Sequence, residues 1–252
     1  MKKKVLAVLL GGCMVAGLVA GCGNSDGGNT SDGGDSADSG SSYHFEVVVK
    51  SFQSTYWQAA IQGIDAAVEE LGVTVNTTGP NAESDIADQV NMLNNAISQN
   101  PDGIALAAND QSAVIDSLKD ALDAEIPVVC FDTGVPDAPE GSVIATIATD
   151  NEAAGAVAAE NMYEVIKDTI ANATEQVRIG EVNQDATSAN ISGRGMGFIN
   201  KMKELIEADG KTVAVIGNQY YVDQVENNGD EGSADVIIEV AVPAQTTVEL
   251  SA

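Results

Sequence analysis

From residue 43 onward, the hydrophobic and polar positions of the chain alternate between two patterns. Short runs of apolar and β-branched residues, the first at 45–50, are each followed by a longer stretch whose apolar residues recur three or four positions apart. The first pattern predicts a buried strand, and the second predicts a helix with one apolar face. Strands that alternate with helices in this way predict an α/β fold with parallel sheets.

The same two patterns place the elements along the chain. Residues 236–242 fit a strand, whereas residues 233–241 also fit the start of a helix, and periodicity does not decide between them. Asn109, Asp110 and Ser112 are expected to cap the helix that follows them. Strands are predicted at 45–50, 73–77, 103–107, 127–131, 143–147, 177–182 and 212–216, and helices around 61–71, 86–97, 114–122, 150–170 and 193–208.

The segment 47–72, VVVKSFQSTYWQAAIQGIDAAVEELG, is the clearest strand–helix unit. Two adjacent aromatics, Tyr56 and Trp57, follow its polar turn, and a predicted helix runs from there to Gly72. Open α/β sheets bind ligands at the carboxyl ends of their strands, where this aromatic pair is expected to lie. The pair is therefore a candidate binding surface, with a hydrophobic plug over the helix start as the alternative.

The first 42 residues predict export of the protein. Three lysines precede an apolar stretch that is short for a membrane span, as in a signal peptide. The stretch ends in Leu-Val-Ala-Gly-Cys, which resembles the bacterial lipobox, so residues 1–22 are expected to be a lipoprotein signal and Cys22 the lipidated residue. An ordinary signal peptide with an incidental Cys22 is the alternative. The Gly-, Ser- and Asp-rich residues 23–42 predict a disordered tether with a reach of about 25 Å.

The charge of the chain argues against several partners. It carries 38 Asp and Glu against 11 Lys and Arg, a formal charge of −27. Nucleic acid and anionic membrane surfaces attract Lys and Arg, so neither is expected to bind, and membrane contact is expected only through a lipid anchor. With Cys22 used as the anchor, Cys130 has no cysteine to pair with. Its place in a predicted strand favours a buried, unreactive thiol.

Five segments together resemble the periplasmic-binding-protein type 1 family, in particular its sugar-binding lipoproteins similar to ribose-binding protein. They are the segment quoted above, NPDGIALAANDQSAV, EIPVVCFDTGV, IATDNEAAGAVAAENM and DATSANISGRGMGF, in the family order. The resemblance implies two Rossmann-like lobes, residues 43–148 and 149–252, that bind a solute between them. It also implies delivery of that solute to an ABC importer, or alternatively to a chemoreceptor. Relatives continue further, so the second lobe is expected to be incomplete and the chain a C-terminally truncated product, which could be non-functional.

The resemblance also implies a set of ligand-binding residues. An aromatic ring would cover the weakly polar face of a sugar, and the Asp132 carboxylate would accept hydrogen bonds from two hydroxyls. Thr133 and Ser192 stand where the ribose binder has arginines, with Arg194 the nearest guanidinium, which argues against ribose but not against a similar polyol. The implied residues are Ser54, Tyr56, Trp57, Asn109, Asp110, Asp132, Thr133, Asp185, Ser192, Arg194 and Tyr221, with Tyr220 as the alternative to Tyr221.

Two other function classes are weaker. An extracytoplasmic carbohydrate-active enzyme needs a nucleophile–base pair, metal ligands or paired carboxylates, and the chain offers one His, the structural-looking Cys130 and no evident acid pair. A DNA-binding repressor shares the fold, but the export signal and the charge oppose it. The sequence therefore predicts a solute-binding protein that acts as a monomer, without catalysis, cofactor or metal, whose partners are a sugar-like small molecule and an ABC permease.

Overall fold

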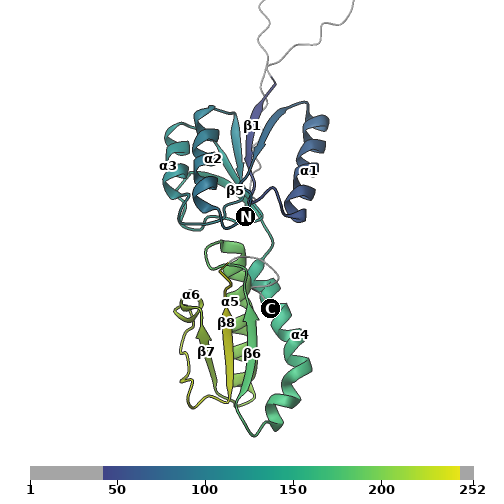
Figure 1. The fold of residues 1–252 in the computed structure, drawn as a ribbon, viewed down its shortest axis with the longest axis vertical. Coiled ribbons are helices and arrows are strands. Elements are labelled where there is room, and N and C mark those ends of the chain that lie inside the picture. The colour runs from purple at the N-terminus through teal and green to yellow at the C-terminus, as the bar shows by residue number, and fades with distance from the viewer. Residues whose placement is uncertain (1–41, 245–252) are drawn as a thin grey trace, which may run out of the picture. The chain divides into compact units, whose positions relative to one another are not determined.

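The computed structural model describes residues 42–244, so the predicted signal, Cys22, nearly all of the tether and residues 245–252 lie outside the described residues. The described strands form two separate sheets, each with all its strands parallel (Figure 1). We call the five-stranded sheet with its helices the first lobe and the three-stranded sheet with its helices the second lobe. This architecture confirms the α/β fold with parallel sheets that the hydrophobic pattern predicts.

In the first lobe, the strands follow the order β2-β1-β3-β4-β5. Helices α2 and α3 pack on one face of this sheet, and α1 packs on the other (Figure 1). The strand β1 lies inside the sheet, between β2 and β3. Val47 and Val48 of β1 are buried in the cores on opposite faces, and Val49, directly after the strand, is buried beside Val47. The elements are β1 (His44–Val48), α1 (Thr55–Leu71), β2 (Thr74–Thr78), α2 (Ile86–Ser98), β3 (Gly103–Leu106), α3 (Ile115–Asp123), β4 (Val128–Phe131) and β5 (Val143–Ile147).

In the second lobe, α4 and α5 share one face of the sheet and one core. The two helices pack closely because a side chain is missing at Gly155, where a Cβ would meet the carbonyl oxygen of Arg194, and at Gly197, where it would meet that of Glu152. The elements are α4 (Asn151–Asn172), β6 (Val177–Val182), α5 (Ala189–Ala208), β7 (Val213–Gly217), α6 (Gln219–Val222) and β8 (Val236–Ala241).

The segment whose pattern fitted either a strand or a helix is the strand β8, and it occupies the centre of the second sheet in the order β6-β8-β7. Val236, Ile237 and Ile238 have no exposed surface, as a central strand requires. The strand β6 has one buried residue, Ile179, against four in β8, as suits an edge strand. Burial on both faces thus decides which strand is central.

Three helix starts differ from the pattern-based prediction. Tyr56 and Trp57 lie in the first turn of α1, not ahead of it. The helix α5 begins at Ala189, four residues before the predicted position, because its N-cap is Ser188. The helix α3 begins at Ile115, since the Asp110 carboxylate caps an earlier turn. Both α1 and α5 therefore start next to the polar residues described below.

The face of the first sheet beside α1 is only partly covered. An open groove of about 320 Å³ lies there, and nearly all of its lining is apolar. Leu71 and Ile144, which line it, are 69% and 64% exposed. Between residues 42 and 244, no helix combines the length and apolar character that a membrane span requires.

Candidate functional site

A polar cavity of about 340 Å³ lies at the carboxyl ends of the strands of the first lobe. It is completed by residues from the start of α5 and from the loop that precedes it, so both lobes contribute to its wall. This is the position where open α/β sheets bind ligands. The lining residues are Lys50, Ser54, Tyr56, Trp57, Glu83, Asp132, Thr149, Gln184, Asn190, Ile191 and Arg194.

Asp132, directly after β4, adopts an unusual backbone conformation. Its φ of +62° lies in the left-handed region, which few residues other than glycine adopt. The turn is held at both sides, because the Asp132 N–H donates to the carbonyl of Ile147 at 2.9 Å and the Thr133 N–H donates to that of Phe131 at 2.7 Å. Such strain is typical of functional sites, and here it accompanies a carboxylate in the cavity wall.

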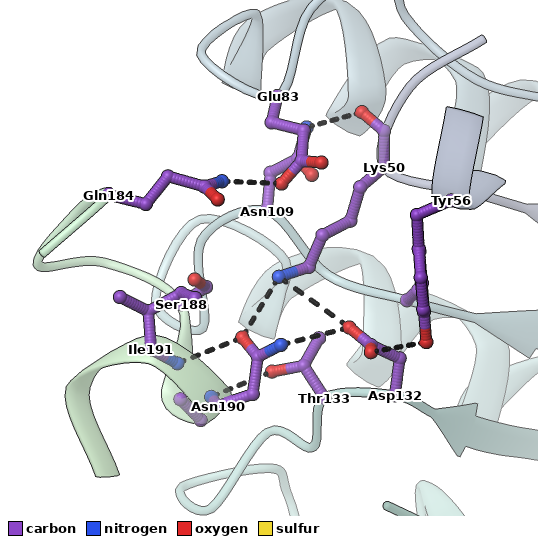
Figure 2. Close-up of polar contacts among 12 residues, drawn as sticks. Lys50, Tyr56, Glu83, Asn109, Asp132, Thr133, Gln184, Ser188, Asn190 and Ile191 are labelled. Carbon is purple, nitrogen blue, oxygen red and sulfur yellow. Dashed lines mark hydrogen bonds and ion pairs between the residues drawn. The ribbon is translucent and has the colours of Figure 1, made fainter. Parts of the chain in front are cut away.

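Tyr56 and Trp57 have different roles in the wall. Tyr56 is 58% exposed, and its hydroxyl donates to Oδ1 of Asp132 at 2.8 Å (Figure 2). Trp57 is only 2% exposed and packs edge-on against Tyr56 and Phe131, with ring centroids 5.0 and 6.0 Å away. The hydrogen bond to the carboxylate raises the pKa of Tyr56, so its hydroxyl remains a donor at neutral pH. Tyr56 is thus the ring that a ligand can reach, and Trp57 supports it from behind.

Lys50 follows β1 and is a buried cation that the sequence reasoning missed. Its side chain is 2% exposed. Nζ of Lys50 donates a hydrogen bond to Oδ1 of Asn190 at 3.0 Å and lies 3.9 Å from Oδ2 of Asp132. Burial lowers the pKa of Lys50, while the charges of Asp132 and Glu83 oppose this shift. A lysine directly after a buried β-branched run was the signal that could have identified it, because that position is the ligand end of the sheet.

Asn190, in the first turn of α5, joins the two lobes and was also missed. Its side-chain amide donates to Oδ2 of Asp132 at 2.9 Å, and its backbone N–H donates to Oγ1 of Thr133 at 3.2 Å (Figure 2). Its side-chain oxygen accepts from Lys50 and from the backbone N–H of Ile191. The sequence pattern places the start of this helix at 193, so Asn190 falls ahead of the predicted helix.

The structure brings five of the sequence-predicted residues into the cavity wall. Arg194 reaches it from α5, where its guanidinium also donates to Oδ1 of Asn151 at 2.7 Å. Lys50 and Arg194 balance the carboxylates of Glu83 and Asp132, so the charged residues of the wall sum to zero. The five residues are Ser54, Tyr56, Trp57, Asp132 and Arg194.

Two further predicted residues lie behind the wall and position it. Thr133 is buried, and its hydroxyl accepts from the Asn190 backbone. Asn109 is also buried, and its side-chain amide donates to the carbonyl of Lys50 at 3.2 Å. Both side chains therefore hold residues that line the cavity, without lining it themselves.

The other four predicted residues have their polar atoms occupied outside the cavity. Oδ1 of Asp110 accepts two backbone N–H groups of its own turn. The Asp185 carboxylate accepts from Thr187 and Ser188 at the start of α5. Ser192 donates to the Ser188 carbonyl at 3.1 Å, and Tyr221, with no exposed surface, donates to the Asp185 carbonyl at 2.8 Å. The geometry gives them structural roles that sequence position alone did not distinguish from ligand contact.

The described residues offer little chemistry for catalysis or metal binding. In the part of the chain from 42 to 244, no group of three or more His, Cys, Asp and Glu side chains is arranged to hold a metal ion. Cys130 is buried, and burial raises the pKa of its thiol to about 11, which keeps it protonated at neutral pH. His44 lies at the opposite end of β1 from the cavity, hydrogen-bonded to Glu46 and Thr74.

Comparison with known proteins identifies the family. Residues 45–239 match the family model described as a periplasmic binding protein domain, so the chain belongs to the periplasmic binding protein family. The family predicted from the five sequence segments is thereby confirmed. Among curated proteins, the chain is similar to the ABC transporter periplasmic-binding protein YphF of Escherichia coli (strain K12), with 28% identity over 78 residues, which are 31% of this chain and 24% of YphF.

Two similar solved structures come from other bacteria. A protein of Brachyspira murdochii, described as an ABC transporter and LacI family transcriptional regulator, matches with a TM-score of 0.62 and 32% identity over 82% of this chain and 59% of its own. An ABC transporter solute binding protein of Agrobacterium vitis with bound D-fucose matches with a TM-score of 0.57 and 29% identity over 71% of this chain and 68% of its own. The chain thus spans about a quarter of YphF and 59% of the Brachyspira protein.

Proposed function

We propose that this protein binds a sugar or a sugar-like solute in the cavity and delivers it to an ABC importer, without catalysis. The observation that carries this proposal is the pairing of Tyr56 with Asp132, because it joins an exposed aromatic ring to a carboxylate at 2.8 Å. A sugar presents a weakly polar ring face together with hydroxyls, and these two groups match it. The bound D-fucose of the Agrobacterium relative and the transporter names of the others support the same class of ligand.

The charge of the cavity wall favours an uncharged ligand. Its two cations and two carboxylates balance, and each carboxylate already has partners within the protein. An anionic or cationic solute would have to leave one of these charges unpaired in a partly buried site, which is costly. Hydroxyl groups can instead exchange hydrogen bonds with Lys50, Asp132 and Asn190 without changing the charge balance. We therefore infer that the solute is a neutral polyol, such as a monosaccharide.

The substitution Asp132→Ala tests the proposal. We expect it to weaken monosaccharide binding by about 10²-fold or more, because two charged hydrogen bonds contribute about 1.5–3 kcal/mol each. Isothermal titration calorimetry with D-fucose, D-arabinose and other monosaccharides would measure the loss relative to the unaltered protein. The variant Asp110→Ala is the matched control, since that carboxylate lies outside the cavity wall, and it should bind as the unaltered protein does. Equal affinity of the Asp132 variant, or no monosaccharide binding by either protein, would contradict the proposal.

We also propose that the protein is held at the outer face of the cell membrane by a lipid on Cys22. The support comes from the lipobox-like sequence before Cys22 and from the Gly-, Ser- and Asp-rich residues that follow it. An anchored, extracytoplasmic position keeps the binding protein near its permease, and it agrees with membership of a periplasmic family.

A further inference from the structure

We propose that Glu83 is a positioning residue that couples contact between the two lobes to the indole of Trp57. Glu83 lies in the loop between β2 and α2, and its carboxylate contacts one residue from each lobe. Oε1 accepts from Nε1 of Trp57 at 2.9 Å, and Oε2 accepts from Nε2 of Gln184, in the loop before α5, at 2.6 Å (Figure 2 shows the second contact). Neither Glu83 nor Gln184 was among the residues predicted from the sequence.

The loop that carries Glu83 is fastened to the first lobe. The Ser51 hydroxyl donates to the Asn81 carbonyl at 2.7 Å, and the Phe52 N–H donates to the Pro80 carbonyl at 3.0 Å. These bonds attach the loop to the turn between β1 and α1, which leads into the first turn of α1, where Trp57 lies. The loop therefore has to move with Trp57 and not with the second lobe.

The loop that carries Gln184 is equally well fastened to the second lobe. The carboxylate of the next residue, Asp185, accepts from the backbone N–H groups of Thr187 and Ser188, and its carbonyl accepts from the buried Tyr221. Because both loops are held by their own lobes, separation of the lobes must break the bond between Gln184 and Glu83. The Trp57 bond, which lies wholly within the first lobe, can survive.

Loss of the Gln184 contact would change what the indole experiences. The indole N–H is a donor only, and Glu83 is the acceptor it has in this structure. Without the hydrogen bond from Gln184, the Glu83 carboxylate is freer to rotate. Its negative charge is then shared with one donor fewer, so the electric field of the carboxylate at the indole of Trp57 changes. Since Trp57 supports the exposed ring of Tyr56, Glu83 makes the aromatic surface of the site depend on whether the second lobe is in contact. This inference needs only two lobes that move, and it does not depend on the ligand being a sugar.

Trp57 is the only tryptophan of the chain, so its fluorescence reports this coupling directly. The experiment compares the emission spectra of the ligand-free protein, Gln184→Ala, Glu83→Ala and the double variant. Gln184 contacts Glu83 and not the indole, yet we expect Gln184→Ala to shift the emission maximum and increase quenching by acrylamide. In the Glu83→Ala background, the same substitution should have no further effect. The variant Gln184→Glu, which opposes two carboxylates, should shift the maximum in the same direction as Gln184→Ala and by more.

Thr187→Val is the matched control, because it removes another hydrogen bond between the lobes, from the Thr187 hydroxyl to the Asn109 carbonyl at 3.2 Å, without touching Glu83. The backbone bond from Gln111 to Thr187 keeps that contact in place. We expect the spectrum of this control to match that of the unaltered protein, and circular dichroism confirms that each variant is folded. The proposal is overturned if both Gln184 variants keep the original spectrum, or if Gln184→Ala has the same effect with and without Glu83.

Discussion

At the scale of single residues, the site depends on charged groups that sit in partly or fully buried positions. Lys50 and Asp132 contact each other, and both contact the side chain of Asn190. Glu181, near the carboxyl end of β6, is less well satisfied. Its Oε1 accepts from Asn183 at 2.7 Å, whereas its buried Oε2 has no hydrogen-bond partner among residues 42–244. Burial raises the pKa of Glu181 to about 7, with the Asn183 hydrogen bond opposing the shift.

This shift predicts how stability depends on pH. Because the folded pKa of Glu181 lies above its ordinary value of 4.5, the folded state binds the proton more tightly, and the unfolding free energy falls as the pH rises from 4.5 to about 7. The loss amounts to at most about 3 kcal/mol. Glu181→Gln should remove this part of the pH dependence in urea unfolding, whereas Glu164→Gln, a change at a 68% exposed carboxylate, should keep it. An unchanged pH profile in the Glu181 variant would show that its carboxyl titrates as an exposed one does.

At the scale of elements, the close packing of α4 on α5 positions the second lobe's side of the cavity. Gly155 of α4 lies against the backbone of Arg194 in α5. Because Arg194 lines the cavity, the distance between these two helices determines where its side chain lies. A side chain at position 155 would push the helices apart.

Gly155→Ala should therefore destabilise the protein by about 1–3 kcal/mol, as overpacking does, and displace Arg194 from the cavity wall. Urea unfolding and the affinity for a bound monosaccharide are the two measurements. Gly63→Ala is the control, because a Cβ at this position of α1 meets nothing within 4 Å. The control should gain about 0.5–1 kcal/mol from better helix propensity. Equal stability changes in the two variants would contradict the packing argument.

At the scale of the whole molecule, the described residues form two lobes that share one cavity. Hydrogen bonds from Asn190, Gln184 and Thr187 link the second lobe to the first. These hydrogen bonds are few, and water can replace each of them when the lobes separate. Contacts of this kind permit a hinge-like opening of the two lobes. The apolar groove on the first sheet is a separate surface, which the cavity does not use.

Cellular location is the prediction that belongs to this scale. Cells that express the chain and are fed an alkyne-labelled fatty acid should attach the label to it, and the protein should fractionate with the membrane. Cys22→Ser should abolish both results, because the thiol that carries the lipid is gone. Cys13→Ser changes a cysteine inside the predicted signal and should leave both unaffected. A labelled Cys22→Ser variant would show that the lipid, if any, is attached elsewhere.

The sequence by itself determined the order of strands and helices up to β7, the family, and the candidate pair of Tyr56 and Asp132. These features depend on local periodicity, turn chemistry and short motifs, and all three are properties of residues that are close together in the sequence. It could not separate Asp110, Asp185 and Tyr221 from true lining residues, because polar residues at loop positions serve as caps as readily as they bind ligands.

Only the tertiary structure decided the rest. The bond between Lys50 and Asn190 joins residues 140 positions apart, and that between Glu83 and Gln184 joins residues 101 apart. The place of β8 at the centre of its sheet likewise depends on how deeply each strand is buried by the others. No local pattern encodes such contacts, because they join residues that are far apart in the sequence and meet only in the folded chain.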